Sequence, residues 1–274
     1  MKRYSFSKLK QKQIRLSASF GKRRLFYFIA ALIASLLVLA GTFLDESLGW
    51  RIIAVFVKFS LAFLAFVLAK QSGYLDPAGD KSLVSPYLIL ALVPVVFSAV
   101  AWLGPFSGPV DYLSVAVGLL GTLGTALWEE LYFRLWGRIL FEENGKYRAF
   151  DFLFIALTFG SMHLINLIAA PAGTVLIQAM LAVLTGLFLQ SLYSVSGSLR
   201  LVILFHFLMN AVNSLFGRWL TDPEAGRFFP ALTAVAPLIL GAFYALCAAI
   251  LTRRAHLLIT PPSLFRRKKD AGKR

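Results

Sequence analysis

The run WEELYFR occupies residues 128–134 and places two adjacent glutamates, Glu129 and Glu130, inside an otherwise apolar stretch. Two of the three histidines, His163 and His206, also lie in apolar runs long enough to span a membrane. Ionisable groups are costly in hydrocarbon, so they seldom persist there without a task. A carboxylate with two imidazoles can activate a water molecule, and these runs therefore point to an intramembrane hydrolase.

The composition is that of a membrane protein. Of the 274 residues, 58% are hydrophobic and 15% are charged, and the mean hydropathy is +0.74. A soluble domain carries about a quarter charged residues. The single cysteine, Cys247, cannot form an internal disulfide. We therefore expect one polytopic unit rather than a set of soluble domains.

The net charge of +15 is concentrated in the two tails. Residues 1–24 hold nine Lys or Arg and no acid, and residues 253–274 hold eight with one acid, Asp270. Basic tails can bind nucleic acid, but here they flank apolar runs, as positive residues do on the cytoplasmic side of a membrane. We expect them to contact anionic lipid headgroups and predict no nucleic-acid partner.

Eight apolar runs are long enough, at about 20 residues each, to cross the bilayer as helices. They are Leu25–Leu44, Ile52–Ala69, Tyr87–Gly104, Tyr112–Leu140, Phe150–Ala170, Thr174–Val195, Leu199–Phe216 and Pro230–Leu251. An even number of spans puts both basic tails on one side, so we predict that both termini are cytoplasmic.

The predicted fold is thus an all-α bundle of about eight transmembrane helices with an interior catalytic cavity. Residues 25–252 form the membrane domain, between a basic cytoplasmic tail at 1–24 and another at 253–274. Lys58 interrupts the second apolar run. We interpret it as a side chain that reaches the interface or that marks a shifted span, and the alternative is that it faces the bundle interior.

The two glutamates of the WEELYFR run point about 100° apart on a helix, so they cannot both aim at one substrate atom. Arg134 follows Glu130 by four residues, on the same face and with the acid on the favoured N-terminal side. We predict a structural or orienting ion pair between Glu130 and Arg134. Glu129 is then free to face a cavity.

The histidines lie in two further motifs with the same spacing of four. His163 follows Phe159, and Asn210 follows His206, so each pair shares a helix face. Three spans can therefore project a carboxylate, an imidazole, and an imidazole with an amide into one pocket. Glu129 and His163 come out about 20 Å from the cytoplasmic helix ends and His206 about 10 Å. The predicted site lies in the inner half of the membrane.

Buried ionisable residues can also serve purposes other than hydrolysis. An intramembrane histidine can form a hydrogen bond that holds two helices together. A glutamate pair can relay protons in a transporter, or it can belong to a non-enzymatic immunity protein that binds without cutting. A transporter should show matched repeats or broken helices, and we find none that is convincing. The His-Glu-x-x-His zinc signature of other proteases is absent.

The three motifs, in this order, resemble the CAAX protease and bacteriocin-processing family, also called CPBP or ABI, which includes the type II CAAX prenyl endopeptidases. The resemblance covers residues 112–216. It implies an eight-helix-like membrane fold and hydrolysis of peptide bonds in membrane-associated proteins or peptides, prenylated or not. It also implies roles in which Glu129 is the general base, His163 is its partner on the catalytic water, and His206 and Asn210 hold the oxyanion.

The resemblance leaves the cofactor open, because the family is described both as metalloproteases and as glutamate-dependent enzymes without a metal. Glu129, His163 and His206 could supply three zinc ligands with an open fourth position. A zinc site would consume Glu129 and leave only Glu130 as a base, and Glu130 is expected to pair with Arg134. We therefore favour the metal-free mechanism.

Overall fold

The computed structural model describes residues 24–40, 47–71, 112–141, 149–220 and 241–251. Within these ranges the chain is helical apart from short turns, with no strand, which confirms the predicted all-α class. The predicted third span, 87–104, and the two basic tails lie outside the described residues, apart from Arg24 at the start of the first helix.

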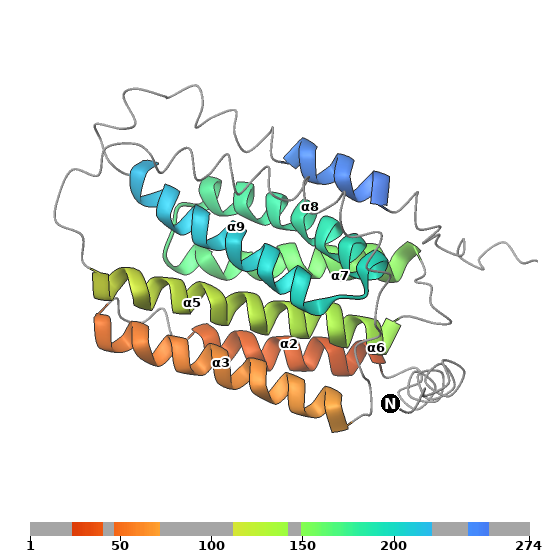
Figure 1. The fold of residues 1–274 in the computed structure, drawn as a ribbon, viewed down its shortest axis with the longest axis horizontal. Helices are drawn as coiled ribbons and strands as arrows, with labels where there is room; N and C mark the ends of the chain where they lie inside the picture. The colour runs from red at the N-terminus through yellow and green to blue at the C-terminus, as the bar shows by residue number, and fades with distance from the viewer. Residues whose placement is uncertain (1–23, 41–46, 72–111, 142–148, 221–240, 252–274) are drawn as a thin grey trace, which may run out of the picture.

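The helices follow one another along the chain and run roughly side by side (Figure 1). They are α2 (Arg24–Ala40), α3 (Leu48–Gln71), α5 (Tyr112–Glu130), the π-helix η4 (Leu131–Trp136), α6 (Gly137–Phe141), α7 (Ala149–Met162), the 3₁₀ helix η5 (His163–Ile168), α8 (Ala172–Ser196), α9 (Leu199–Leu220) and a final helical segment, Gly241–Leu251.

Four helical segments in the described ranges are long and apolar enough to cross a membrane: Leu48–Lys70, Tyr112–Phe141, Phe150–Ile168 and Ala172–Ser194. Three shorter apolar helices, Phe28–Leu37, Leu199–Ala211 and Gly241–Leu251, coincide with other predicted runs. The chain is therefore an integral membrane protein. The count of eight spans and the interior cavity stay predictions.

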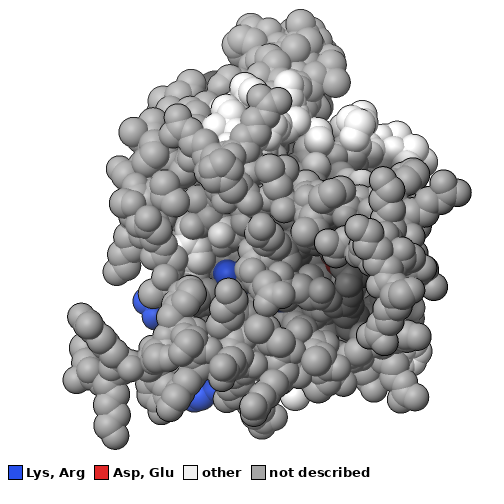
Figure 2. Space-filling view, turned by 90° about the vertical axis from the view of Figure 1, so that its right-hand side faces the viewer, with Lys and Arg blue, Asp and Glu red and all other residues white. Residues whose placement is uncertain are grey.

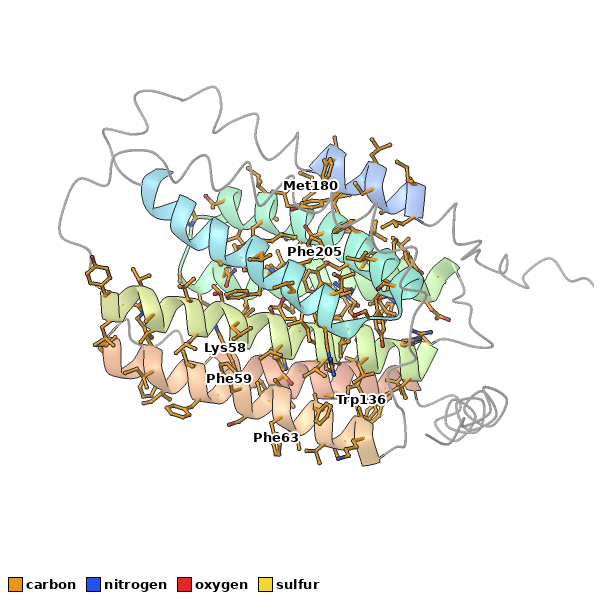
Figure 3. The ribbon with its side chains drawn as sticks, viewed as in Figure 1. Lys58, Phe59, Phe63, Trp136, Met180 and Phe205 are labelled. Atoms are coloured by element: carbon orange, nitrogen blue, oxygen red, sulfur yellow. The ribbon has the colours of Figure 1, made fainter. Side chains whose placement is uncertain are left out.

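Glycines allow α3 and α5 to pack closely and in parallel. A Cβ atom at Gly121 would lie 3.7 Å from the Val55 side chain, and one at Gly124 would lie 3.0 Å from Cβ of Lys58. Lys58 thus lies in the middle of α3, facing α5 (Figure 3). The interpretation of Lys58 as an interfacial side chain or the mark of a shifted span is wrong, because the facing glycines leave room for it inside the bundle.

Helices α7 and α8 form a second close pair, which is antiparallel. A Cβ atom at Gly160 would lie 2.7 Å from the backbone oxygen of Ala179, and one at Gly186 would lie 3.0 Å from the Phe159 ring. This packing fixes the end of α7, where Phe159 and His163 lie. At Met162 the helix tightens into η5, whereas the sequence predicted one uninterrupted span over 150–170.

The predicted span 112–140 is one continuous helical segment, but its hydrogen bonding changes directly after Glu130. The π-helix η4 begins at Leu131, and such widened turns are frequent at functional sites. Its side chains tie the segment to its neighbours. The Tyr132 hydroxyl donates to the Phe28 carbonyl of α2, and Nε1 of Trp136 donates to the Ala65 carbonyl of α3 over 3.0 Å.

Helix α9 crosses α5 obliquely (Figure 1). It begins at Leu199, as predicted, yet His206 near its start contacts Glu130, which lies well inside the 112–141 segment. His206 and Glu130 lie at different distances from the ends of their own helices, and they still meet because α9 is tilted relative to α5. The start of α9 agrees with the predicted one.

Candidate active site

His206 of α9 lies between the two glutamates of α5. Its Nδ1 is 2.7 Å from Oε1 of Glu130, and its Nε2 is 3.4 Å from Oε2 of Glu129. All three side chains are buried, with exposed fractions of 3%, 0% and 4% for His206, Glu130 and Glu129. The angular offset of adjacent helical residues thus brings the two carboxylates to the two nitrogens of one ring.

The Glu130 carboxylate accepts hydrogen bonds from two side chains. Its Oε1 accepts from His206, and its Oε2 accepts from Nε of Arg134 over 2.8 Å, so the ion pair predicted from the spacing of four is present. The guanidinium keeps this carboxylate ionised, and an ionised carboxylate only accepts. Nδ1 of His206 therefore carries a hydrogen. This bond fixes the ring, with Nε2 turned toward Glu129.

Glu129 has an unused acceptor. Its Oε2 is buried and makes no hydrogen bond within the described residues, because the contact at 3.4 Å to His206 has the distance of an ion pair but not the alignment of a hydrogen bond. Burying a polar atom is costly unless it is hydrogen-bonded. Glu129 is thus poised to accept a hydrogen bond from a molecule that enters the site.

The Phe159 ring organises the residues around the glutamates. Its centroid lies 5.3 Å from that of His163, 5.8 Å from that of His206, and 5.0 Å from Cζ of Arg134. The negative face of an aromatic ring attracts a guanidinium. Phe159 therefore supports both histidines and the partner of Glu130. Its spacing from His163 was visible in the sequence, but this supporting role was not.

His163 begins η5 and is half-buried. Its Nδ1 lies 3.0 Å from the Phe159 carbonyl oxygen. A carbonyl only accepts, so Nδ1 carries the hydrogen and the neutral ring keeps a lone pair on Nε2. Within the described residues no hydrogen bond or ion pair joins His163 to Glu129. The direct contacts join Glu129 to His206, and His163 to Phe159.

The two asparagines near the motifs differ in their surroundings. Asn210 is half-buried one turn after His206 and makes no hydrogen bond within the described part of the chain. Asn166 donates to Oε1 of Gln178 over 2.9 Å and so links η5 to α8. Asn210 therefore has a free amide beside the site, whereas Asn166 has a partner elsewhere.

The three residues that could have bound zinc do not form a metal-binding cluster within the described residues. Across the described ranges, no three His, Cys, Asp or Glu side chains are placed to hold a metal ion. Glu129 approaches His206, but His163 is bonded to the Phe159 carbonyl.

Two residues near the site have neighbours that the sequence did not predict. Gln190 of α8 is fully buried, and its Oε1 lies 3.5 Å from Nη1 of Arg134. Lys58 of α3 faces α5 at Gly124, five residues before Glu129. The sequence does show Gln190 as a polar amide inside the apolar run 174–195, but nothing in the sequence linked it to Arg134.

Residues 111–212 match the family model described as type II CAAX prenyl endopeptidase Rce1-like. This central region is therefore similar to the CAAX proteases. The match confirms the resemblance seen in the motifs and includes every residue of the three motifs. No curated protein and no solved structure matches the chain. The proteins that this model describes are endopeptidases.

Proposed function

We propose that the chain is an intramembrane endopeptidase in which Glu129 activates the water that attacks the peptide bond. The observation that carries this proposal is the buried Oε2 of Glu129, which lies beside Nε2 of His206 and makes no hydrogen bond within the described residues. A general base must be within hydrogen-bond reach of the proton that it removes, and this oxygen can accept from a water molecule.

The proposed hydrolysis consumes one water molecule and uses the Glu129 carboxylate to carry one proton. Glu129 takes one proton from water as the water oxygen forms a bond to the carbonyl carbon of the substrate. The C–N bond then breaks, and the proton held by Glu129 passes to the leaving amine. The products are a carboxylic acid and an amine, and Glu129 returns to its starting form.

His206 and Asn210 are proposed to stabilise the oxyanion. When the His206 ring is protonated, Nδ1–H donates to Glu130 and Nε2–H faces the space beside Glu129. The amide of Asn210, one turn further on α9, is a second donor. Donors that are held in place before the reaction stabilise developing negative charge without reorganising. Glu130 and Arg134 hold this arrangement and take no proton.

His163 is proposed to orient the catalytic water. Its Nε2 lone pair can accept from one water hydrogen while Glu129 accepts the other. The shared contact with Phe159 holds His163 and His206 on one aromatic ring, which supports a common site for the two histidines.

The proposed topology has eight spans with both termini in the cytoplasm. The ends of α3, α6 and α9 that meet at one end of the bundle carry Lys70, Arg138 and Arg200. Lys and Arg atoms are seen on that end in Figure 2. Both basic tails would then bind anionic headgroups on the same side.

The test is cleavage of a membrane-anchored peptide by purified protein in lipid, compared with Glu129→Gln. We expect the wild type to release the cleaved fragment and Glu129→Gln to lose turnover while it keeps the wild-type melting temperature. Ser194→Ala is the matched control and should cleave normally, because the Ser194 hydroxyl donates to the Gln190 backbone oxygen within α8. Turnover by Glu129→Gln at the wild-type rate would refute the mechanism.

A further inference from the structure

Gln190 is a polar side chain in a place where a polar group is costly. It lies in the candidate span Ala172–Ser194 and has an exposed fraction of 0%. Burying an amide away from water costs free energy unless it is hydrogen-bonded. Its one side-chain hydrogen bond in the described part of the chain is to Arg134, at the long distance of 3.5 Å, and its Nε2 has no partner there.

The contact with Gln190 gives the Arg134 guanidinium a second hydrogen bond, while its Nη2 makes none within the described residues. Nε of Arg134 donates to Glu130, Cζ lies over the Phe159 ring, and Nη1 donates to Gln190. A bond on each of two nitrogens and a ring against the face together restrict the position and the tilt of a planar group. Gln190 is also uncharged, so it accepts from Arg134 without competing with Glu130 for the positive charge.

A continuous series of polar contacts thus joins the helical segments around the site. It runs from Gln190 of α8 to Arg134 of η4, then to Glu130 of α5, and then to His206 of α9. The two inner contacts are short, at 2.8 and 2.7 Å. Gln190 is the end of this series farthest from Glu129.

We propose that Gln190 is a positioning residue of the active site, which holds Arg134 so that Glu130 keeps the His206 ring turned toward Glu129. Removing the amide lets the guanidinium tilt, weakens its bond to Glu130 and changes the hydrogen bond at Nδ1 of His206. The effect on turnover rests on the proposed function. The effect on the His206 ring does not.

The direct test follows the ring nitrogens of histidine by NMR in protein labelled at its three histidines. In Gln190→Met, which has a similar length and no polar atoms, the His206 nitrogens should shift while those of His163 stay in place. In the control Ser194→Ala, one turn further on the same helix, neither should move. His206 signals at their wild-type positions in folded Gln190→Met would overturn the proposal.

A second variant covers the case in which Gln190→Met does not fold. Gln190→Glu keeps the shape and the acceptor but adds a charge that draws Arg134 away from Glu130. We expect the His206 nitrogens to shift in this variant as well, and unchanged signals would again overturn the proposal.

Turnover gives an independent readout. Small displacements of catalytic groups lower rates by up to about a hundredfold. We expect Gln190→Met to lower kcat by about tenfold or more and to leave KM within about twofold, whereas Ser194→Ala should change neither. If the His206 signals shift in Gln190→Met but the wild type cleaves nothing, the proposed function is refuted and the positioning role of Gln190 stands. A Gln190→Met variant with normal kcat would refute the positioning role.

Discussion

The imidazole of His206 donates its Nδ1–H to Oε1 of Glu130 over 2.7 Å, which joins two motifs that lie 76 residues apart. The same carboxylate accepts from Arg134 through its other oxygen. Glu130 therefore belongs to the framework that orients the site, whereas Oε2 of the adjacent Glu129 makes no hydrogen bond among the residues that the structure describes. The two glutamates differ in their partners, and this difference separates their expected behaviour on mutation.

Glu130→Gln should lower stability and activity together. An amide has one acceptor oxygen, and its NH₂ group would face a donor of either Arg134 or His206. Breaking a buried ion pair on one side costs about 3–5 kcal/mol. Thermal unfolding in detergent should show a clear drop for Glu130→Gln and for Arg134→Ala. Glu129→Gln is the matched comparison and should unfold like the wild type. A well-folded but inactive Glu130→Gln together with an active Glu129→Gln would reverse the two roles.

Asn210→Ala should slow the reaction without weakening substrate binding. Losing one oxyanion donor lowers kcat by about a hundredfold to a thousandfold, which corresponds to about 3–4 kcal/mol in the barrier. The measurement is kcat and KM on one membrane-anchored peptide. Asn166→Ala is the control, because Asn166 is bonded to Gln178 and should keep a rate near the wild type. If Asn210→Ala raised KM and left kcat unchanged, Asn210 would bind substrate instead.

The parts of the site that depend on local geometry could be predicted from the sequence. The ion pair between Glu130 and Arg134 follows from the spacing of four on one helix, and so does the contact between Phe159 and His163. Contacts between helices could not be predicted this way. The bond from His206 to Glu130 depends on the tilt of α9, and the bond from Arg134 to Gln190 depends on how α8 packs beside η4.

The fold shows the same division. Long apolar runs predict helices well, because crossing the bilayer demands about 20 apolar residues and internal backbone hydrogen bonds. The change to a π-helix at Leu131 and to a 3₁₀ helix at His163 had no sequence signal that we could use. Both changes begin at or near a proposed catalytic residue. The position of Lys58 inside the bundle also could not be predicted, because it depends on the space that Gly124 of the neighbouring helix α5 leaves.

The metal-free mechanism predicts that chelation leaves activity intact. Glu129, His163 and His206 do not form a cluster that could hold a metal within the described residues, so purified protein should contain well under one zinc per chain. Metal content measured by mass spectrometry and activity after prolonged dialysis against chelator test this expectation. One bound zinc that is lost in His163→Ala or His206→Ala, with activity restored only by added metal, would contradict it.

The topology predicts that both termini are cytoplasmic. Both tails are basic, and an even number of spans puts them on the side where positive residues accumulate. Cysteine labelling in intact cells can check this, after Cys247, which is buried, is replaced by Ala. Cysteines placed in each tail should react only after the membrane is made permeable. A tail that reacts in intact cells would contradict the eight-span arrangement.

The close packing of α7 on α8 predicts that Gly160→Ala disturbs the site from outside it. The added Cβ would lie 2.7 Å from the Ala179 backbone oxygen and 2.2 Å from the Val183 side chain, so the two helices must move apart. Overpacking of this kind costs about 1–3 kcal/mol. His163 and Phe159 lie within one turn of Gly160, so we expect a lower melting temperature and a lower kcat together.

Gly173→Ala is the control, since nothing lies within 4 Å of the added atom and alanine favours the helix there. A Gly160→Ala variant as stable and as active as Gly173→Ala would show that α7 and α8 do not need this contact to place His163.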